Sequence, residues 1–342
     1  MSDKTREEMF DLRDPGAAAP YDDSEGGAGR LKQGVLSGLS KGWSGFVWML
    51  KILIPISFLT MLLEWSGWLR HLDFLIEPIM GILGLPAMAA LPLIIGMLTG
   101  VYGGIAAMVV LPFSPEEMTL MAIFILIAHN LIQEGVIQGK SGLNPIKATV
   151  FRLGAAAVTV VCAAQFLGPT SAAAQAAGGV ASAAVEPFLP MLRTWGLEML
   201  HLSLKIFLII MSIMILLEVL KALDWIKHIV RLLSPFLKAL GLSRGVGILW
   251  MAAVVFGLAY GAAVIVEEAK RGDLSKDELE TLHLSIGINH SMIEDPILFL
   301  SLGLSAFWLW VPRLVTAVIA VRLLSFWHRR SRRAQYFDSS IR

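Results

Sequence analysis

The sequence predicts an all-α, polytopic membrane protein, and three observations lead to this prediction. Of the 342 residues, 56% are hydrophobic and only 16% are charged, whereas soluble domains carry roughly 25% charged residues. Long apolar stretches recur along the chain, and Lys and Arg cluster near their ends. Because a bilayer core requires about 20 mostly apolar residues in a helix, this composition argues against a soluble enzyme.

Eight stretches are long and apolar enough to enter a bilayer. They lie near Trp43–Trp65, Ala87–Pro112, Met118–Gln138, Thr149–Leu167, Leu197–Leu220, Val246–Val266, Leu279–Leu304 and Phe307–Phe326. Two further segments, Leu69–Leu85 and Trp225–Leu240, carry charges at helical spacing. They are predicted to lie in the membrane interface as amphipathic helices.

The hydrophobic part consists of two similar halves, separated by an Ala- and Gly-rich segment at 168–185. Residues 114–135 align without a gap on residues 275–296, and this alignment pairs His129 with His290. Matches at a nearly constant offset are typical of a duplicated unit. The sequence therefore predicts an internal repeat.

The positions of basic residues predict how the halves are oriented, because Lys and Arg near span ends mark the cytoplasmic side. The clusters are Arg30, Lys32 and Lys41; Lys140, Lys147 and Arg152; Lys221, Lys227, Arg231, Lys238 and Arg244; and Arg329, Arg330, Arg332 and Arg333. All four are cytoplasmic if each half crosses three times and its third stretch is broken and returns to the side it entered. Three crossings per half give inverted repeats, the plan of many secondary transporters.

This topology divides the chain into five parts and places both termini in the cytoplasm. They are a disordered tail at 1–40, a first membrane repeat at 41–168, an external connector at 169–193, a second repeat at 194–328 and a basic tail at 329–342. The single cysteine, Cys162, excludes an intramolecular disulfide and a cysteine zinc site held by this chain alone. The net charge of +1 gives no reason to expect a nucleic-acid partner.

Candidate binding residues gather in the third stretch of each half. A charged or strongly polar group at membrane depth costs roughly 2.5–3.5 kcal/mol on insertion scales, so its presence points to a function. Pro296 disfavours helix before it, which leaves free carbonyls near Asp295 for a cation or a substrate hydroxyl. The candidates for a solute and its coupling ion are His129, Asn130, Gln133, Glu134, Asn289, His290, Glu294 and Asp295.

Two alternatives for these residues stay open. Imidazole with carboxylate suits iron, zinc or manganese better than magnesium, and the metal ligands would then be His129, Glu134, His290, Glu294 and Asp295. The polar groups could instead pair only with each other across the repeat interface.

Further candidate binding residues lie outside these two clusters. They are Tyr102, Tyr260, His283, Glu64 and Glu218. The glycines around both tyrosines equally permit close helix packing. Glu64 and Glu218 fall at span ends, where a carboxylate costs little. No catalytic set is recognisable, since Ser291 and His290 are sequence neighbours that do not face each other on a helix. No cofactor is expected.

Three runs resemble a known family. They are Gly-Val-Tyr-Gly-Gly at 100–104, its partner at 257–261, and His-x-x-x-Glu-Asp-Pro at 290–296. They are similar to the bacterial nucleoside-recognition, or Gate, domain membrane proteins. Related Gate segments occur in concentrative nucleoside transporters, in ferrous iron transport protein B and in spore maturation proteins. The resemblance covers Trp43 to Phe326 and implies a permease-like inverted repeat in the bacterial inner membrane.

Three functional hypotheses follow. The first is a secondary transporter for a small polar solute, with a nucleoside as the leading candidate, coupled to H⁺ or Na⁺. An unperturbed imidazole titrates near pH 6.5, which suits a proton-linked cycle. The second is transport of a divalent metal ion, and the third is a membrane partner protein that transports nothing. The expected partners are the lipid bilayer, the solute and its coupling ion, with a second copy of the chain as a further candidate.

Overall fold

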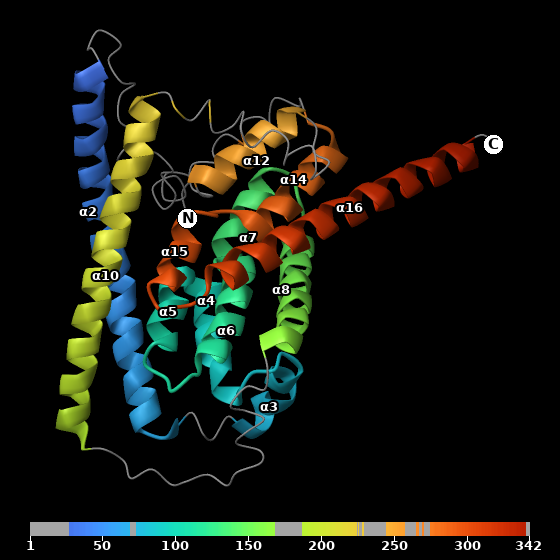
Figure 1. Cartoon of the computed structure of the whole chain (residues 1–342). Coiled ribbons are helices and arrows are strands. Elements are labelled where there is room, and N and C mark those ends of the chain that lie inside the picture. Colours follow the sequence, from blue (N-terminus) through green and yellow to red (C-terminus); the bar gives the residue numbers. More distant parts are fainter. Residues whose placement is uncertain are drawn as a thin grey trace, which may run out of the picture.

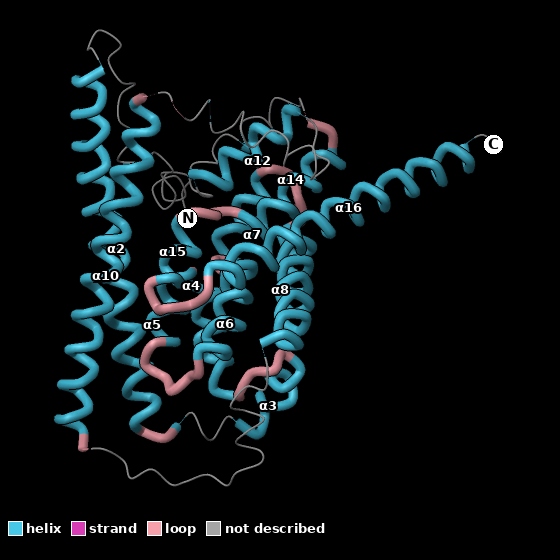
Figure 2. The backbone as a smooth tube through the Cα atoms, in the orientation of Figure 1, coloured by secondary structure: helices cyan, strands magenta, loops and turns pink. Residues whose placement is uncertain are grey.

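The computed structural model describes residues 27–68, 73–167, 187–223, 244–256 and 274–339, with single positions between 225 and 269. In these residues the regular elements are helices (Figures 1 and 2). They are α2 (Gly27–Trp65), α3 (Asp73–Ile82), the short 3-10 helix η2 (Ala87–Ala89), α4 (Ala90–Thr99), α5 (Val101–Met108), α6 (Pro115–Ala128), α7 (Leu131–Lys140), α8 (Pro145–Leu167), α10 (Phe188–Ala222), α12 (Arg244–Phe256), α14 (Lys276–Asn289), α15 (Glu294–Leu300) and α16 (Ala306–Ser339). The predicted all-α class is confirmed.

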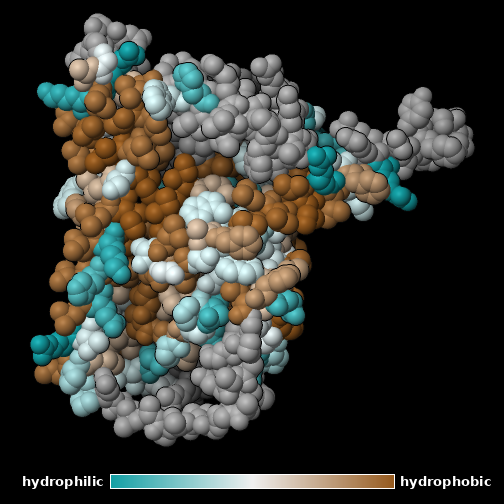
Figure 3. Space-filling model, viewed as in Figure 1, coloured by the Kyte–Doolittle hydropathy of each residue, from teal (hydrophilic) through white to brown (hydrophobic). Residues whose placement is uncertain are grey.

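Five helical segments of the described part are long and apolar enough to cross a membrane. They are α2, α6 with α7, α8, α10 and residues 306–328 of α16. Their outer faces carry apolar side chains such as Leu59 and Leu200, which are 58% and 66% exposed, and Figure 3 shows this apolar surface over α2 and α10. Side chains of this kind face lipid in a bilayer. The chain is a polytopic membrane protein.

The third stretch of each half is broken, as predicted, and each break begins at a histidine rather than at Gly135 or Pro296. α6 begins with a capping box formed by Ser114 and Glu117, and α14 begins with the same arrangement at Ser275 and Glu278. α6 ends at Ala128 and α14 at Asn289, and the capping residues that follow, His129 and His290, have an extended backbone conformation. The next residues, Asn130 and Ser291, both have a φ of 50°. These local matches agree with a duplication, while the repeat of complete halves stays a prediction.

The second stretch of the first half folds back on itself at Gly100. Gly100 has φ 93° and ψ −175°, which a residue with a side chain rarely adopts. It lets α5 return along α4, so that a Cβ on Gly104 would lie 3.4 Å from the Cα of Gly96. By contrast, Pro115–Lys140 remains one span-length apolar segment despite its break at residues 129–130. The predicted return of this stretch to the side it entered stays a prediction.

The first helix begins earlier than expected. α2 starts at Gly27, so the prediction of disorder up to residue 40 is wrong for residues 27–40. Gly34, Gly38 and Gly42 face α10, and a Cβ on Gly38 would lie 2.5 Å from the Cα of Ile215. Small residues at this spacing allow two membrane helices to approach closely. The pair α2 and α10 stands at one side of the bundle in Figure 1.

The remaining boundaries are tested only in part. α10 begins at Phe188, so the last residues of the expected connector 169–193 belong to this helix. α3 makes an angle of 86° with the helix that follows it, as an interfacial helix would, although its place at the membrane surface stays a prediction. Residues 1–26, the segment 229–240 and Tyr260 lie outside the described residues.

Candidate functional site

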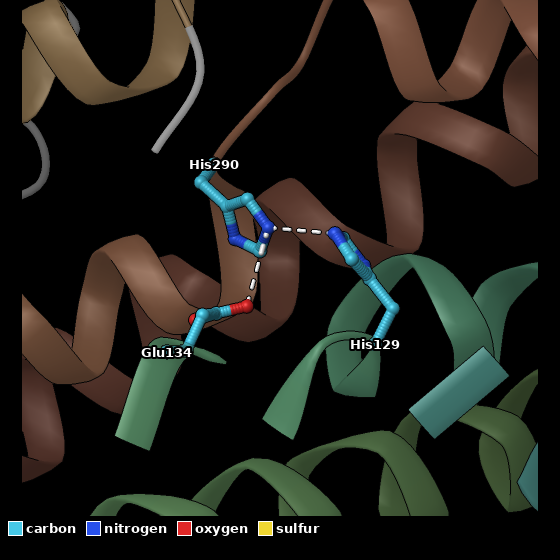
Figure 4. A group of neighbouring side chains, drawn as sticks. All are labelled: His129, Glu134 and His290. Atoms are coloured by element: carbon cyan, nitrogen blue, oxygen red, sulfur yellow. Dashed lines mark hydrogen bonds and ion pairs between the residues drawn. The ribbon is translucent and has the colours of Figure 1, made fainter. Parts of the chain in front are cut away.

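A histidine pair joins the two broken helices inside the protein. His129 directly follows α6 and His290 directly follows α14, and their Nε2 atoms lie 2.8 Å apart (Figure 4). Each residue is only 3% exposed. The pair therefore lies where the first and second halves of the chain meet.

Two carboxylates contact the histidines in a crossed pattern. Glu134 on α7 places Oε1 at 3.4 Å from Nε2 of His290. Asp295 on α15 places Oδ2 at 3.4 Å from Nε2 of His129. Each acid thus contacts the histidine of the other half. The four side chains form one cluster, which we call the His–acid cluster.

Two buried arginines hold the ends of the broken helices. Arg152 on α8 donates from Nε to the carbonyl of Ile127 and from a terminal nitrogen to that of His129, at 3.0 and 2.9 Å. Arg313 on α16 donates in the same way to Ile288 and His290, at 3.1 and 3.0 Å. The last carbonyls of a helix lack partners within the helix and carry partial negative charge. A guanidinium donates hydrogen bonds to these carbonyls, and its positive charge offsets their partial negative charge.

Neither arginine is among the site residues that the sequence predicts. Arg152 was counted among the basic residues that mark the cytoplasmic side, but it is 1% exposed and lies in the protein interior. A signal was present, because Arg152 and Arg313 are 161 residues apart, the same separation as His129 and His290. Extending the alignment by one helix would have found the pair.

The hydrogen bonds of the ring nitrogens fix the state of both imidazoles. Nδ1 of His129 lies 2.9 Å from the carbonyl of Ile125, and Nδ1 of His290 lies 3.1 Å from that of Ile286. A carbonyl only accepts, so each Nδ1 carries a hydrogen. In a neutral ring Nε2 is then a bare acceptor, and two acceptors 2.8 Å apart repel. A proton or a metal cation at Nε2 would remove this repulsion.

Four further predicted residues, Glu294, Asn289, Asn130 and Gln133, lie close to the His–acid cluster in the sequence but differ in surroundings. Glu294 accepts a hydrogen bond from the hydroxyl of Tyr102 on α5, which joins α5 to α15. Asn289 is completely buried, and neither its amide nitrogen nor its oxygen has a hydrogen-bond partner among the described residues. Asn130 is half-buried beside Gly100, while Gln133 is exposed on α7.

The other candidates are not brought to the cluster. His283 is buried on α14, and its Nε2 has no hydrogen-bond partner within the described part of the chain. Glu218 lies on α10 and is bound by Lys41, Lys221 and Ser37. Glu64 lies at the end of α2, half-buried, as expected for an interfacial carboxylate.

Comparison with known proteins places the chain in a family. The family described as "Gate: Nucleoside recognition" matches residues 46–139. An uncharacterized membrane protein of Bacillus subtilis, YvoD, is 30% identical over 294 residues, which are 84% of this chain and 93% of the relative. The chain belongs to the Gate family. No solved structure matches the chain significantly.

The Gate match runs from α2 to the end of α7 and so includes His129, Glu134 and the reversal at Gly100. His290, Asp295 and both buried arginines lie outside the matched residues. The family is a transporter-associated family of membrane proteins. The protein is accordingly a multi-pass, transport-related Gate protein.

Proposed function

We propose that this Gate protein is a secondary transporter of the bacterial inner membrane that moves a small polar solute together with H⁺ or Na⁺. The observation that carries the proposal is the His–acid cluster, which is buried and is assembled from both halves of the chain. A nucleoside is the first solute to test, because nucleoside recognition is the description of the matching family. Both chain termini lie in the cytoplasm in this proposal.

The crossed contacts support coupling between ion binding and movement. Glu134 contacts His290, and Asp295 contacts His129, so a displacement of one half against the other alters both contacts and the His–His contact together. A ligand shifts a conformational equilibrium only through different affinities for the two states. A cation at this cluster would bind the two states with different affinities, since only the state in which the two halves are in contact offers it ligands from both.

Neighbouring polar groups supply contacts for the solute. Asn289 offers a donor and an acceptor that have no partner among the described residues. Glu294 and Tyr102 offer a carboxylate and a hydroxyl, which suit sugar hydroxyl groups. Asn130 and Gln133 flank the break on the side of the first half. Amides of this kind recognise the polar edges of a base.

The test is uptake of radiolabelled nucleosides into proteoliposomes, with an imposed H⁺ or Na⁺ gradient. Uptake driven by one gradient is expected for the unaltered protein. The variant Glu134→Gln with Asp295→Asn keeps the size of both side chains and should lose gradient-driven uptake while remaining folded. Lys147→Gln with Glu280→Gln is the matched control, since it removes an ion pair of 2.6 Å on the exposed ends of α8 and α14.

Two results would contradict the proposal. Unchanged gradient-driven uptake in the doubly neutralised variant would remove the cluster from the coupling step. Absence of any solute flux in folded, reconstituted protein, tested with nucleosides, nucleobases and other small polar solutes, would favour the non-transporting membrane partner instead.

A further inference from the structure

We propose that the His–acid cluster binds a divalent transition-metal ion through Nε2 of His129, Nε2 of His290 and the carboxylate of Glu134. This inference goes beyond the proposed transport of a solute and does not rest on it. The three ligand atoms lie within 4.8 Å of one another, and all three residues are buried. They come from α6, α7 and α14, so the ion would join the two halves of the chain.

The hydrogen bonds around the ligands are those of a metal site. A histidine that binds a metal almost always donates its other ring N–H to a carbonyl or a carboxylate, which fixes the ring and its tautomer. Both histidines do so, to Ile125 and Ile286. The carboxylate is also held, by an ion pair of 2.8 Å between Glu134 and Arg152. The unshared electron pairs of both Nε2 atoms are thereby directed to one place.

The distances between ligand atoms fit a small tetrahedral ion. Zn–N bonds of about 2.0–2.1 Å at tetrahedral angles place two ligand atoms about 3.4 Å apart. Nε2 of His290 and Oε1 of Glu134 are already 3.4 Å apart. The two Nε2 atoms are closer, at 2.8 Å, so the rings must separate by roughly 0.6 Å to admit the ion. Asp295, whose Oδ2 is 3.4 Å from Nε2 of His129, is the nearest further acid for a fourth bond.

The donor set selects the class of ion. Two imidazoles with carboxylate suit zinc, iron or manganese. Magnesium and calcium prefer oxygen ligands alone. Zn²⁺ is therefore the probe, with Mg²⁺ as the comparison ion.

The experiment uses the full chain, purified in detergent, freed of metal with a chelator and dialysed. Zn²⁺ is titrated against a competing indicator, and the bound metal is counted by mass spectrometry. We expect one Zn²⁺ per chain, no detectable Mg²⁺, and a higher melting temperature with Zn²⁺ by mass action. His290→Ala should abolish stoichiometric binding. His201→Ala, on the exposed face of α10, is the matched control and should bind Zn²⁺ as the unaltered protein does.

A second variant guards against misfolding. Glu134→Gln keeps the shape of the side chain and should lower Zn²⁺ affinity by at least about 10–100-fold. Folded, unaltered protein that takes up no Zn²⁺ would overturn the inference. So would full binding in both His290→Ala and Glu134→Gln. Zn²⁺ binding without solute uptake would contradict only the proposed function, whereas uptake without Zn²⁺ binding would contradict only the metal site.

Discussion

The break between α6 and α7 and the break between α14 and α15 share a backbone frame but differ in charge. Each has a histidine at the end of the first helix, a residue with φ of 50° after it, and an arginine on the same two carbonyls. In the first break Arg152 also pairs with Glu134 at 2.8 Å. In the second, Asp295 is the counterpart of Glu134. No carboxylate of the described residues, Asp295 included, lies within 4.0 Å of Arg313.

The acid of each half is therefore held differently. In the first half, Glu134 is held by its own arginine and is fixed in place. In the second half, the side chain of Asp295 is one carbon shorter, and its Oδ2, like both carboxylate oxygens of Glu134, accepts no hydrogen bond among the described residues. The second break is also longer, with four residues between α14 and α15 against two between α6 and α7. The first break is therefore shorter and has an ion pair between its arginine and its acid, whereas the second has none within 4.0 Å in the described part of the chain.

The largest expected effect is on stability when each arginine is removed. Arg152→Ala leaves Glu134 as a buried carboxylate without its cation, which typically costs about 3–5 kcal/mol. Arg313→Ala removes two hydrogen bonds to carbonyls and strands no carboxylate within 4.0 Å in the described part. We expect the free energy of unfolding, measured by SDS titration in mixed micelles, to fall further in Arg152→Ala.

A rescue sharpens this test. The double variant Arg152→Met with Glu134→Gln should be more stable than the single variant Arg152→Met, because it leaves no buried carboxylate without its cation. Equal losses for the two single arginine variants, with no recovery in the double variant, would show that the ion pair has no energetic weight.

The next effect concerns Gly100, which borders the first break. A Cβ at Gly100 would lie 2.9 Å from the side-chain amide of Asn130, and its φ of 93° disfavours any side chain. Gly100→Ala should lower stability by about 1–3 kcal/mol. Gly303, after α15, has a similar φ of 86° but open space around it. Gly303→Ala should therefore cost less, and an equal cost for both would exclude the contact with Asn130 as a cause.

Much of this architecture could be predicted from the sequence. Apolar length and helical periodicity indicate the spans, and the paired histidines at a constant offset indicate both breaks. The span signals depend on residues within one helix, and the histidine signal depends on aligning the two halves. The crossed contacts could not be predicted, since they depend on how α7 and α15 pass each other.

The missed features are those where a local rule competes with packing. Lys and Arg usually mark the cytoplasmic side, but Arg152 is drawn into the interior by two helix carbonyls and Glu134. Residues 27–40 look like a flexible tail by composition, yet Gly34 and Gly38 allow close packing on α10. In both cases the residues that determine the structure lie on another helix.

The smallest expected effect tests the left-handed residue of each break. Asn adopts a positive φ more readily than Ser, so Asn130→Ser would give the first break the residue type of the second. We expect a loss of about 0.5–1 kcal/mol. The control is Asn144→Ser, where the side chain accepts hydrogen bonds from Ile146 and Lys147 at the start of α8. Ser serves there nearly as well as Asn, so this variant should stay within a few tenths of a kcal/mol of the unaltered protein. If Asn130→Ser changed stability as little as Asn144→Ser, the conformational preference of Asn130 would not contribute to the stability of the first break.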